Sequence, residues 1–257
     1  MSGCDDYSIK IWDVNEGKVK QTLKGHKGLV WDLMLIDDNF LVSASGDKTI
    51  KVWNIAEGTV LRTLSGHSEK VLALKNIKNG DLASGSGDST IKFWNLDNGA
   101  LKKTLKGHTG EVWALVLLNN GDLVSSSSDS TIKIWDIESG LVKRTLNEHS
   151  SCINRLTLLK NGDLVSGSND NTIKIWNIED GTVKRNLTGH TSFIFAFIVL
   201  DNGDLVSGSN DGTIKLWNVE DGKIKIDIKI NSKVNSFAVL QNGDLVSSSD
   251  KSIIIWV

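Results

Sequence analysis

The sequence has little cysteine, which limits the chemistry it can support. Cys4 and Cys152 are the only two cysteines, and neither has a second one at Cys-x-x-Cys spacing. Disulfide frameworks and zinc sites need several cysteines at short, regular spacings, so the sequence predicts neither. Isolated thiols are typical of a reducing compartment. We therefore expect an intracellular protein, in the cytoplasm or the nucleus.

An excess of charge of one sign is also missing. The chain carries 29 Lys and Arg residues against 31 Asp and Glu residues, a formal net charge of −2. Proteins that bind nucleic acid or anionic membranes have clustered, excess Lys and Arg. No apolar run reaches the ~18 residues of a membrane span, and residues 1–10 lack the basic-then-apolar order of a signal peptide. We expect neither nucleic acid as the main partner nor a membrane.

What the sequence does have is a repeat. Six tryptophans follow one another at intervals of 41 residues, and a seventh comes 39 residues after the sixth. An aspartate stands six residues before each of them. The tryptophans are Trp12, Trp53, Trp94, Trp135, Trp176, Trp217 and Trp256. A fixed period of this length is the signature of a repeat architecture, so the fold follows from the structure of one repeat.

Each repeat contains four strand-like runs, for which residues 152–159, 163–168, 172–178 and 182–187 serve as the example. Asn161-Gly162 joins the first two runs, and Asn-Gly is a strong hairpin signal because both residues tolerate positive φ. The same pair recurs at residues 79–80, 120–121, 202–203 and 242–243. The repeat therefore predicts a four-stranded antiparallel meander.

The four runs differ in polarity. The first three are apolar at most positions, as expected of strands whose sheet is covered on both faces. The fourth run is charged, with Lys143 and Arg144 in one repeat and Lys184 and Arg185 in the next. Charge on a strand prevents it from pairing with another molecule, so the fourth run is expected at an outer edge. This order, from hub to rim, favours a ring of blades.

Two dipeptides mark the ends of the repeats. Gly-His stands at residues 25–26, 66–67, 107–108 and 189–190, and Glu148-His149 is a variant of it. Trp-Asp stands at residues 12–13 and 135–136 and becomes Trp-Asn in four other repeats. These repeats resemble the WD40 family, whose units run about 40–45 residues between the same dipeptides. The resemblance covers essentially the whole chain and implies an all-β fold, a β-propeller of four-stranded antiparallel blades.

The number of blades follows from the tryptophans and the ends of the chain. Ser2-Gly3-Cys4 aligns with the end of a second strand, so the first two strands of blade one are missing, and the chain stops on a third strand. Seven full repeats would need about 30 residues more than the 257 present. We expect residues 1–257 to form one propeller domain of seven blades, N-terminally shortened, with the first blade incomplete. The alternative is a ring of six in which Lys18–Leu23 closes the last blade.

Every full repeat holds a Ser, a His and an Asp, the residues of a catalytic triad. A triad acts once, in one cleft beside an oxyanion hole, whereas this set recurs in repeat after repeat. By the resemblance, the set forms a buried hydrogen-bond network with the repeat tryptophan, and such networks stabilise one arrangement of a blade. Its members are His26, His67, His108, His149, His190, Asp47, Asp88, Asp129, Asp170, Asp211, Ser43, Ser84, Ser125, Ser166, Ser207, Trp53, Trp94, Trp135, Trp176 and Trp217.

No motif for other chemistry is present. The sequence lacks a P-loop, a His-Glu-x-x-His pair and a dinucleotide-binding Gly-x-Gly-x-x-Gly. We therefore expect no enzyme activity, no catalytic residues, no metal, no cofactor and no small-molecule substrate. In the last repeat, residues 229–231 replace Gly-His, so that blade is expected to lack the full network.

If the repeated residues make the frame, binding belongs where the repeats differ. The repeats differ at the start of the first strand. The resemblance implies that residues at this position contact partners on the top face. Aromatic side chains at such positions supply most of the energy of a protein interface. The alternative is that they fill the inner core. The candidates are Trp31, Lys70, Leu72, Glu111, Trp113, Asn154, Phe193, Phe195 and Asn235.

The expected function is therefore a non-catalytic interaction scaffold that binds a peptide or protein. A second possibility is the substrate-recognition module of a larger multidomain protein, for example one associated with a ligase, kinase or NTPase. The family covers many unrelated roles, because fold does not determine partner.

Overall fold

The structure is a computed structural model that describes residues 1–77, 80–240, 242–250 and 252–256. All of its regular elements are strands, β1 to β26, and in these ranges no helix is long and apolar enough to cross a membrane. The chain divides into two compact units, each described by itself. Unit 1 comprises Met1–Ser125 and Trp135–Val142, and unit 2 comprises Ser126–Ile134 and Lys143–Val257.

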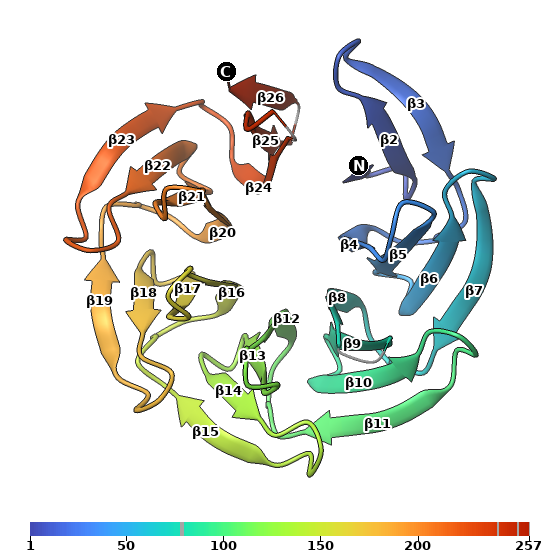
Figure 1. The fold of residues 1–257 in the computed structure, drawn as a ribbon, viewed down its shortest axis with the longest axis horizontal. Coiled ribbons are helices and arrows are strands. Elements are labelled where there is room, and N and C mark those ends of the chain that lie inside the picture. The colour runs from blue at the N-terminus through green and yellow to red at the C-terminus, as the bar shows by residue number, and fades with distance from the viewer. Residues whose placement is uncertain (78–79, 241, 251, 257) are drawn as a thin grey trace. The chain divides into compact units, whose positions relative to one another are not determined.

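Three sheets lie wholly within unit 1, and they run from blue to green in Figure 1. The first has the order β1 (Ser2–Gly3), β2 (Ile9–Asp13), β3 (Lys18–Leu23). The second consists of β4 (Val30–Leu35), β5 (Phe40–Ser45), β6 (Thr49–Asn54) and β7 (Thr59–Ser65). The third consists of β8 (Val71–Asn76), β9 (Asp81–Ser86), β10 (Thr90–Asn95) and β11 (Leu101–Lys106).

The fourth sheet is divided between the units. Its strands, in sheet order, are β12 (Val112–Leu117), β13 (Leu123–Ser127), β14 (Ile132–Trp135) and β15 (Val142–Leu146).

Unit 2 contains three further sheets. The fifth consists of β16 (Ile153–Leu158), β17 (Leu164–Ser168), β18 (Ile173–Trp176) and β19 (Val183–Leu187). The sixth consists of β20 (Ile194–Val199), β21 (Leu205–Ser209), β22 (Thr213–Trp217) and β23 (Ile224–Lys229). The seventh has three strands, β24 (Val234–Val239), β25 (Leu245–Ser249) and β26 (Ile253–Trp256).

The described residues thus form seven antiparallel sheets of the β-propeller type, each a meander, and the expected fold class is confirmed. The six-blade alternative is wrong, because Lys18–Leu23 pairs with β2 of its own sheet in the register Ile9↔Leu23. One detail of the first blade also needs correction. The end of its second strand is present as β1, which pairs with β2 through Ser2↔Lys10 and Gly3↔Ile9.

The Asn-Gly hairpins form as expected, but not through a turn in which both residues take positive φ. Only the glycine takes positive φ, at 88° for Gly162, while Asn161 does not. The amide of Gly162 donates to the Leu159 carbonyl, and the amide of Asp163 donates to the Asn161 side chain. This is a three-residue loop in which glycine follows a type I turn. Asn79 of the second predicted hairpin lies outside the described residues.

The repeat tryptophan fills the interface between a sheet and the one before it in the same unit. Trp94 packs with Val42 and Ile50 of the second sheet, and Trp217 packs with Val165 and Ile173 of the fifth. A buried tryptophan removes about 150–250 Å² from water, so each of these residues provides much of the contact between neighbouring sheets. Within unit 1 the charged fourth strands lie on the outside and are largely exposed, as expected of edge strands (Figure 1).

Candidate protein-interaction surface

Each complete network links a third-strand tryptophan to a loop through three polar side chains. In the third sheet the Trp94 indole donates to Ser84 Oγ at 2.8 Å, and Ser84 Oγ lies 2.8 Å from His67 Nε2. On the other side of the ring, His67 Nδ1 lies 2.8 Å from Asp88 Oδ2. The Asp88 carboxylate also accepts hydrogen bonds from Thr90 and from the backbone amide of Ser68. The network therefore fixes the loop before β8 to strands β9 and β10.

The partners fit a neutral histidine. The indole N–H can only donate and the Asp88 carboxylate only accepts, so each has a partner when Ser84 donates to His67 Nε2 and His67 donates from Nδ1. Ser84 Oγ also lies 3.4 Å from the Lys92 carbonyl. A neutral histidine protonated on Nδ1 satisfies every member. Burial acts in the same direction, since it lowers the pKa of His67 below the usual value.

The aspartates stay ionised although they are half-buried. Burial raises the pKa of Asp47, but hydrogen bonds from Thr49, the backbone of Lys27 and His26 outweigh it and lower the pKa to about 2. Asp211 behaves in the same way, with a pKa of about 2. The pKa of Asp170 is also well below its usual range. A fixed carboxylate therefore anchors one end of each of these networks.

The same hydrogen bonds recur along the chain. The histidine Nε2 to serine Oγ distances are 2.6 Å for His26 and Ser43 and 2.7 Å for the three pairs His108–Ser125, His149–Ser166 and His190–Ser207. Indole donors to these serines are Trp53, Trp135, Trp176 and Trp217. Asp129, whose repeat crosses between the units, accepts hydrogen bonds from the amide and hydroxyl of Thr131.

The last repeat departs from this pattern. Trp256 still donates to Ser247, but residues 229–231 supply no histidine to continue the network. Asp250 accepts instead from the side chain of Asn235 at 3.0 Å and forms an ion pair with Lys233 at 3.2 Å. In the described part of the seventh sheet, no histidine therefore connects the Trp256–Ser247 hydrogen bond to Asp250.

These Ser-His-Asp sets are hydrogen-bonded like a catalytic triad, but their serine oxygens are buried. Ser43, Ser84, Ser125, Ser166 and Ser207 are each 0% exposed, and each accepts an indole hydrogen bond. A nucleophile needs a substrate carbonyl within reach of its oxygen. In the folded sheets these serine oxygens are buried, and their hydrogen bonds join strands and loops of the same repeat.

The candidate residues of unit 1 gather where three first strands begin. Trp31 is the second residue of β4 and Trp113 the second of β12, while Lys70 and Glu111 directly precede β8 and β12. The two indoles meet edge to face, with centroids 5.9 Å apart and an interplanar angle of 90°. Trp31 is 38% exposed. We call Trp31, Lys70, Glu111 and Trp113 the tryptophan cluster.

Lys70 lies at the centre of the tryptophan cluster. Its Nζ is 5.7 Å from the centroid of the Trp31 ring and 5.4 Å from that of Trp113, and it forms an ion pair of 3.0 Å with Glu111. The Trp113 Nε1 atom is buried and, among the described residues, has no hydrogen-bond partner. The cluster thus combines an exposed aromatic ring, both signs of charge and an unused donor.

Sequence reasoning missed two glycines beside this cluster, of which Gly87 leaves little space for a Cβ and Gly46 would accept one at an ordinary contact distance. A side chain at Gly46 would lie 3.5 Å from Trp31 Nε1, and one at Gly87 would lie 3.2 Å from Lys70 Cγ. The corresponding positions of later repeats carry Ser128, Asn169 and Asn210. The signal was therefore available in the repeat alignment, as two glycines at a position that otherwise bears a polar side chain.

Unit 2 holds a second aromatic pair. Phe193 directly precedes β20 and is 42% exposed, and Phe195 is the second residue of that strand and half-buried. Their rings lie edge to face with centroids 6.3 Å apart. Asn235 is likewise the second residue of β24, but its side chain is hydrogen-bonded to Asp250.

Two candidates do not suit a binding role. Leu72 is 2% exposed and Asn154 is 4% exposed, so neither side chain is available to a partner. Asn154 donates to Asn169 at 2.7 Å and to the Ile194 carbonyl at 3.0 Å, which ties β16 to β20. The Asn154 side chain therefore joins neighbouring sheets, and both residues are left out of the proposed surface.

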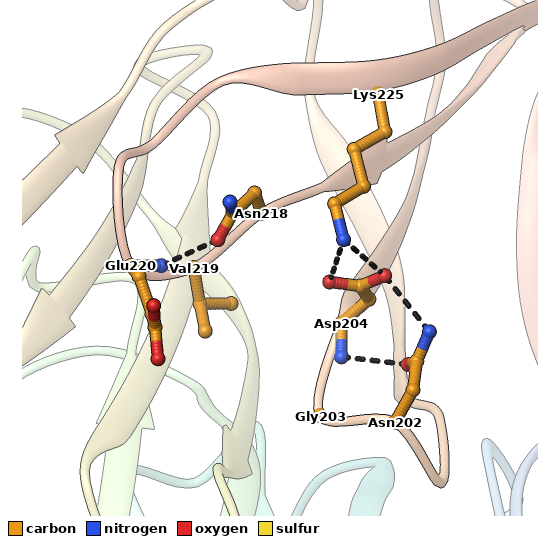
Figure 2. Close-up of a pocket in the computed structure, with 7 residues that line it drawn as sticks. All are labelled: Asn202, Gly203, Asp204, Asn218, Val219, Glu220 and Lys225. Atoms are coloured by element: carbon orange, nitrogen blue, oxygen red, sulfur yellow. Dashed lines mark hydrogen bonds and ion pairs between the residues drawn. The ribbon is translucent and has the colours of Figure 1, made fainter.

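A polar hollow of about 300 Å³ lies elsewhere in unit 2, and Figure 2 shows why it is a weaker candidate. Lys225 binds both carboxylate oxygens of Asp204 at 2.7 Å, and Asn202 caps the same carboxylate. The pair recurs in the fifth sheet as Lys184 and Asp163. Its polar atoms thus serve a repeated structural contact, and within the described residues no group of three acidic, His or Cys side chains could hold a metal.

Comparison with known proteins identifies the repeats. No curated protein matches the sequence. Six stretches match the WD40 family, described as WD domain, G-beta repeat, namely residues 17–54, 58–95, 99–136, 140–177, 181–218 and 228–257. Each of the first five runs from the glycine before a fourth strand to the residue after the next repeat tryptophan. These stretches cover most of the sequence, and the chain therefore belongs to the WD40 repeat family.

Proposed function

We propose that this protein is a non-catalytic scaffold that binds a protein or peptide through the starts of its first strands. In unit 1 the contacts are made by the tryptophan cluster, and in unit 2 by Phe193 and Phe195. WD40 propellers are typically interaction scaffolds, and the site decides which partner is bound.

The exposure of Trp31 supports this proposal most strongly. The five repeat tryptophans from Trp53 to Trp217 are at most 1% exposed, whereas Trp31 is 38% exposed. A large aromatic ring costs little conformational entropy to hold and gains much by being covered, which is why tryptophan is enriched at the energetic centres of interfaces. The charged Lys70 and Glu111 beside it would provide the polar part of such a contact.

Partner capture tests the proposal. The wild-type chain and the single variants Trp31→Ala and Phe193→Ala are used to capture proteins from an extract of cells that express it. Leu61→Ala and Leu101→Ala are matched controls, because these leucines are 45% and 46% exposed but lie on the outer strands β7 and β11.

We expect a protein that the wild type and both leucine variants retain and that at least one aromatic variant loses. Circular dichroism must show all variants folded. A partner retained by both aromatic variants and lost by a leucine variant would contradict the proposal, since it would place binding on the outer strands.

A further inference from the structure

The position of Lys70 suggests what kind of group the partner presents. An ammonium group within about 6 Å of an aromatic centroid is attracted by the negative face of the ring. Lys70 is within this range of two indoles at once, and Glu111 neutralises it from a third side. Two tryptophan rings and a carboxylate together make a binding site for a cation, and the chain's own lysine occupies it.

The two rings are not needed to hold a lysine at this position of the repeat. Lys233 occupies the corresponding position of the last repeat and pairs with Asp250 at 3.2 Å, and no aromatic ring lies within cation–π distance of it among the described contacts. An ion pair alone therefore suffices there. The indoles beside Lys70 are an addition to that arrangement.

The hold on Lys70 is also weak. Its side chain is 33% exposed and that of Glu111 is 34% exposed, so the ion pair is partly screened by water. Lysine loses much rotamer entropy when it is fixed in one place. Beside it, the buried Trp113 Nε1 has no acceptor, and an unmet donor is costly. A ligand with a more favourable cation could therefore displace Lys70. An acceptor for Trp113 Nε1 would have to come from another part of that ligand, because a cationic side chain only donates.

We propose that Lys70 fills, in the unbound protein, a cation site that takes an arginine side chain of the bound partner. This rests on the proposed function and names the chemistry of its ligand. The guanidinium replaces the Lys70 ammonium on the indole faces and pairs with Glu111, while Lys70 swings into solvent.

Arginine suits the site better than lysine for two reasons. Its planar guanidinium stacks on aromatic faces, and its paired N–H groups bind both oxygens of a carboxylate. It is also more weakly hydrated than an ammonium, so less water must be stripped from it. An arginine can therefore displace the resident lysine. A lysine of the partner would gain no such contact, because it carries the same ammonium group as Lys70.

The test uses N-acetyl-L-arginine amide as the probe, with the lysine and citrulline analogues as controls. Binding is followed by the indole N–H resonances of Trp31 and Trp113 in a nuclear magnetic resonance titration. Lys70→Met removes the competing ammonium and keeps the apolar stem, and Lys233→Met is its matched control.

We expect the arginine probe to shift the Trp31 and Trp113 resonances and the citrulline analogue to leave them unmoved. Lys70→Met should tighten arginine binding on the order of tenfold, as for a site whose open state is about one-tenth populated. Lys233→Met should bind like the wild type. Glu111→Gln in the Lys70→Met background should weaken binding roughly fivefold, the upper range for a partly exposed ion pair.

Equal binding of arginine and citrulline, or an arginine affinity that Lys70→Met leaves unchanged or lowers, would overturn the proposal. This failure is distinct from failure of the proposed function. If Trp31→Ala abolishes partner capture while no arginine probe binds, the surface is an interaction site of another chemistry. If arginine binds the cluster but the aromatic variants keep their partner, the cation site stands and the scaffold surface lies elsewhere.

Discussion

Neutral, buried histidines make the stability of this fold depend on pH. Burial lowers the pKa of His26, His67 and His190 in the folded protein, so below the ordinary value of about 6.5 the unfolded chain binds more protons. Their contribution to stability is present above that value and is lost as the pH falls toward the lower folded pKa. Protonation of Nε2 would also remove an acceptor from the serine hydroxyl.

We therefore predict that the urea midpoint of unfolding falls between pH 7 and pH 5. A second loss should be steepest between about pH 3.8, where the unfolded aspartates are half protonated, and about pH 2, the folded pKa of Asp47 and Asp211. A midpoint that is constant or rises from pH 7 to pH 5 would show that the histidines are not held neutral.

Replacing the central serine of a network should lower the free energy of unfolding more in a repeat that has the histidine. Ser84→Ala leaves the Trp94 indole N–H and His67 Nε2 buried without partners, which should cost about 2–4 kcal/mol of unfolding free energy. Ser247→Ala in the last repeat strands only the half-buried Trp256 indole and should cost about 1 kcal/mol. Urea unfolding of both variants measures the difference. Equal losses would mean that the histidine hydrogen bond contributes nothing.

At the scale of the element, backbone conformation at the turns determines which residues are tolerated there. Gly162 has a φ of 88°, and a Cβ added there would meet no atom within 4 Å. Gly162→Ala should therefore destabilise the protein by roughly 1 kcal/mol through backbone strain alone.

Gly46→Ala is the matched control, because its φ is not positive and its nearest contact would be an ordinary 3.5 Å. We expect a change within about 0.5 kcal/mol for it in the same urea experiment. A loss at Gly46 as large as at Gly162 would mean that left-handed conformation is not the cause.

The strands could be predicted from the sequence because every repeat states the same pattern. The 41-residue period and the Asn-Gly turn locate the strands of a blade, and the charged fourth run identifies the outer edge. The turn type at Asn161-Gly162 could not be predicted, because Asn-Gly suits both a two-residue and a three-residue loop.

The exposure of the variable positions was also beyond prediction. Trp31 and Leu72 occupy the same place in their repeats, yet one is 38% and the other 2% exposed. Asn154, at the same place in its repeat, is held inward by its hydrogen bonds to the Ile194 carbonyl and the Asn169 side-chain oxygen. One repeat alone does not contain this information.

At the scale of the whole molecule, our proposal assigns two tasks to two sets of residues. In the networks of the described residues, the repeated Trp, Ser, His and Asp side chains hydrogen-bond to one another inside the sheets. The residues that differ between repeats hold the exposed rings and the partly exposed Lys70–Glu111 pair. Binding should therefore be separable from stability by mutation.

The most direct test measures the affinity of a captured partner for folded Trp31→Ala and Ser84→Ala proteins below their unfolding temperatures. We predict that Trp31→Ala weakens binding by at least about thirtyfold, the 2 kcal/mol of an interface hot spot. Loss of its edge-to-face contact with Trp113 should lower the unfolding free energy by about 0.5–1.5 kcal/mol, less than the loss in Ser84→Ala. Ser84→Ala should lose stability and keep the wild-type affinity. Unchanged affinity of Trp31→Ala, or a loss of affinity in folded Ser84→Ala, would contradict the division between a repeated frame and a variable binding surface.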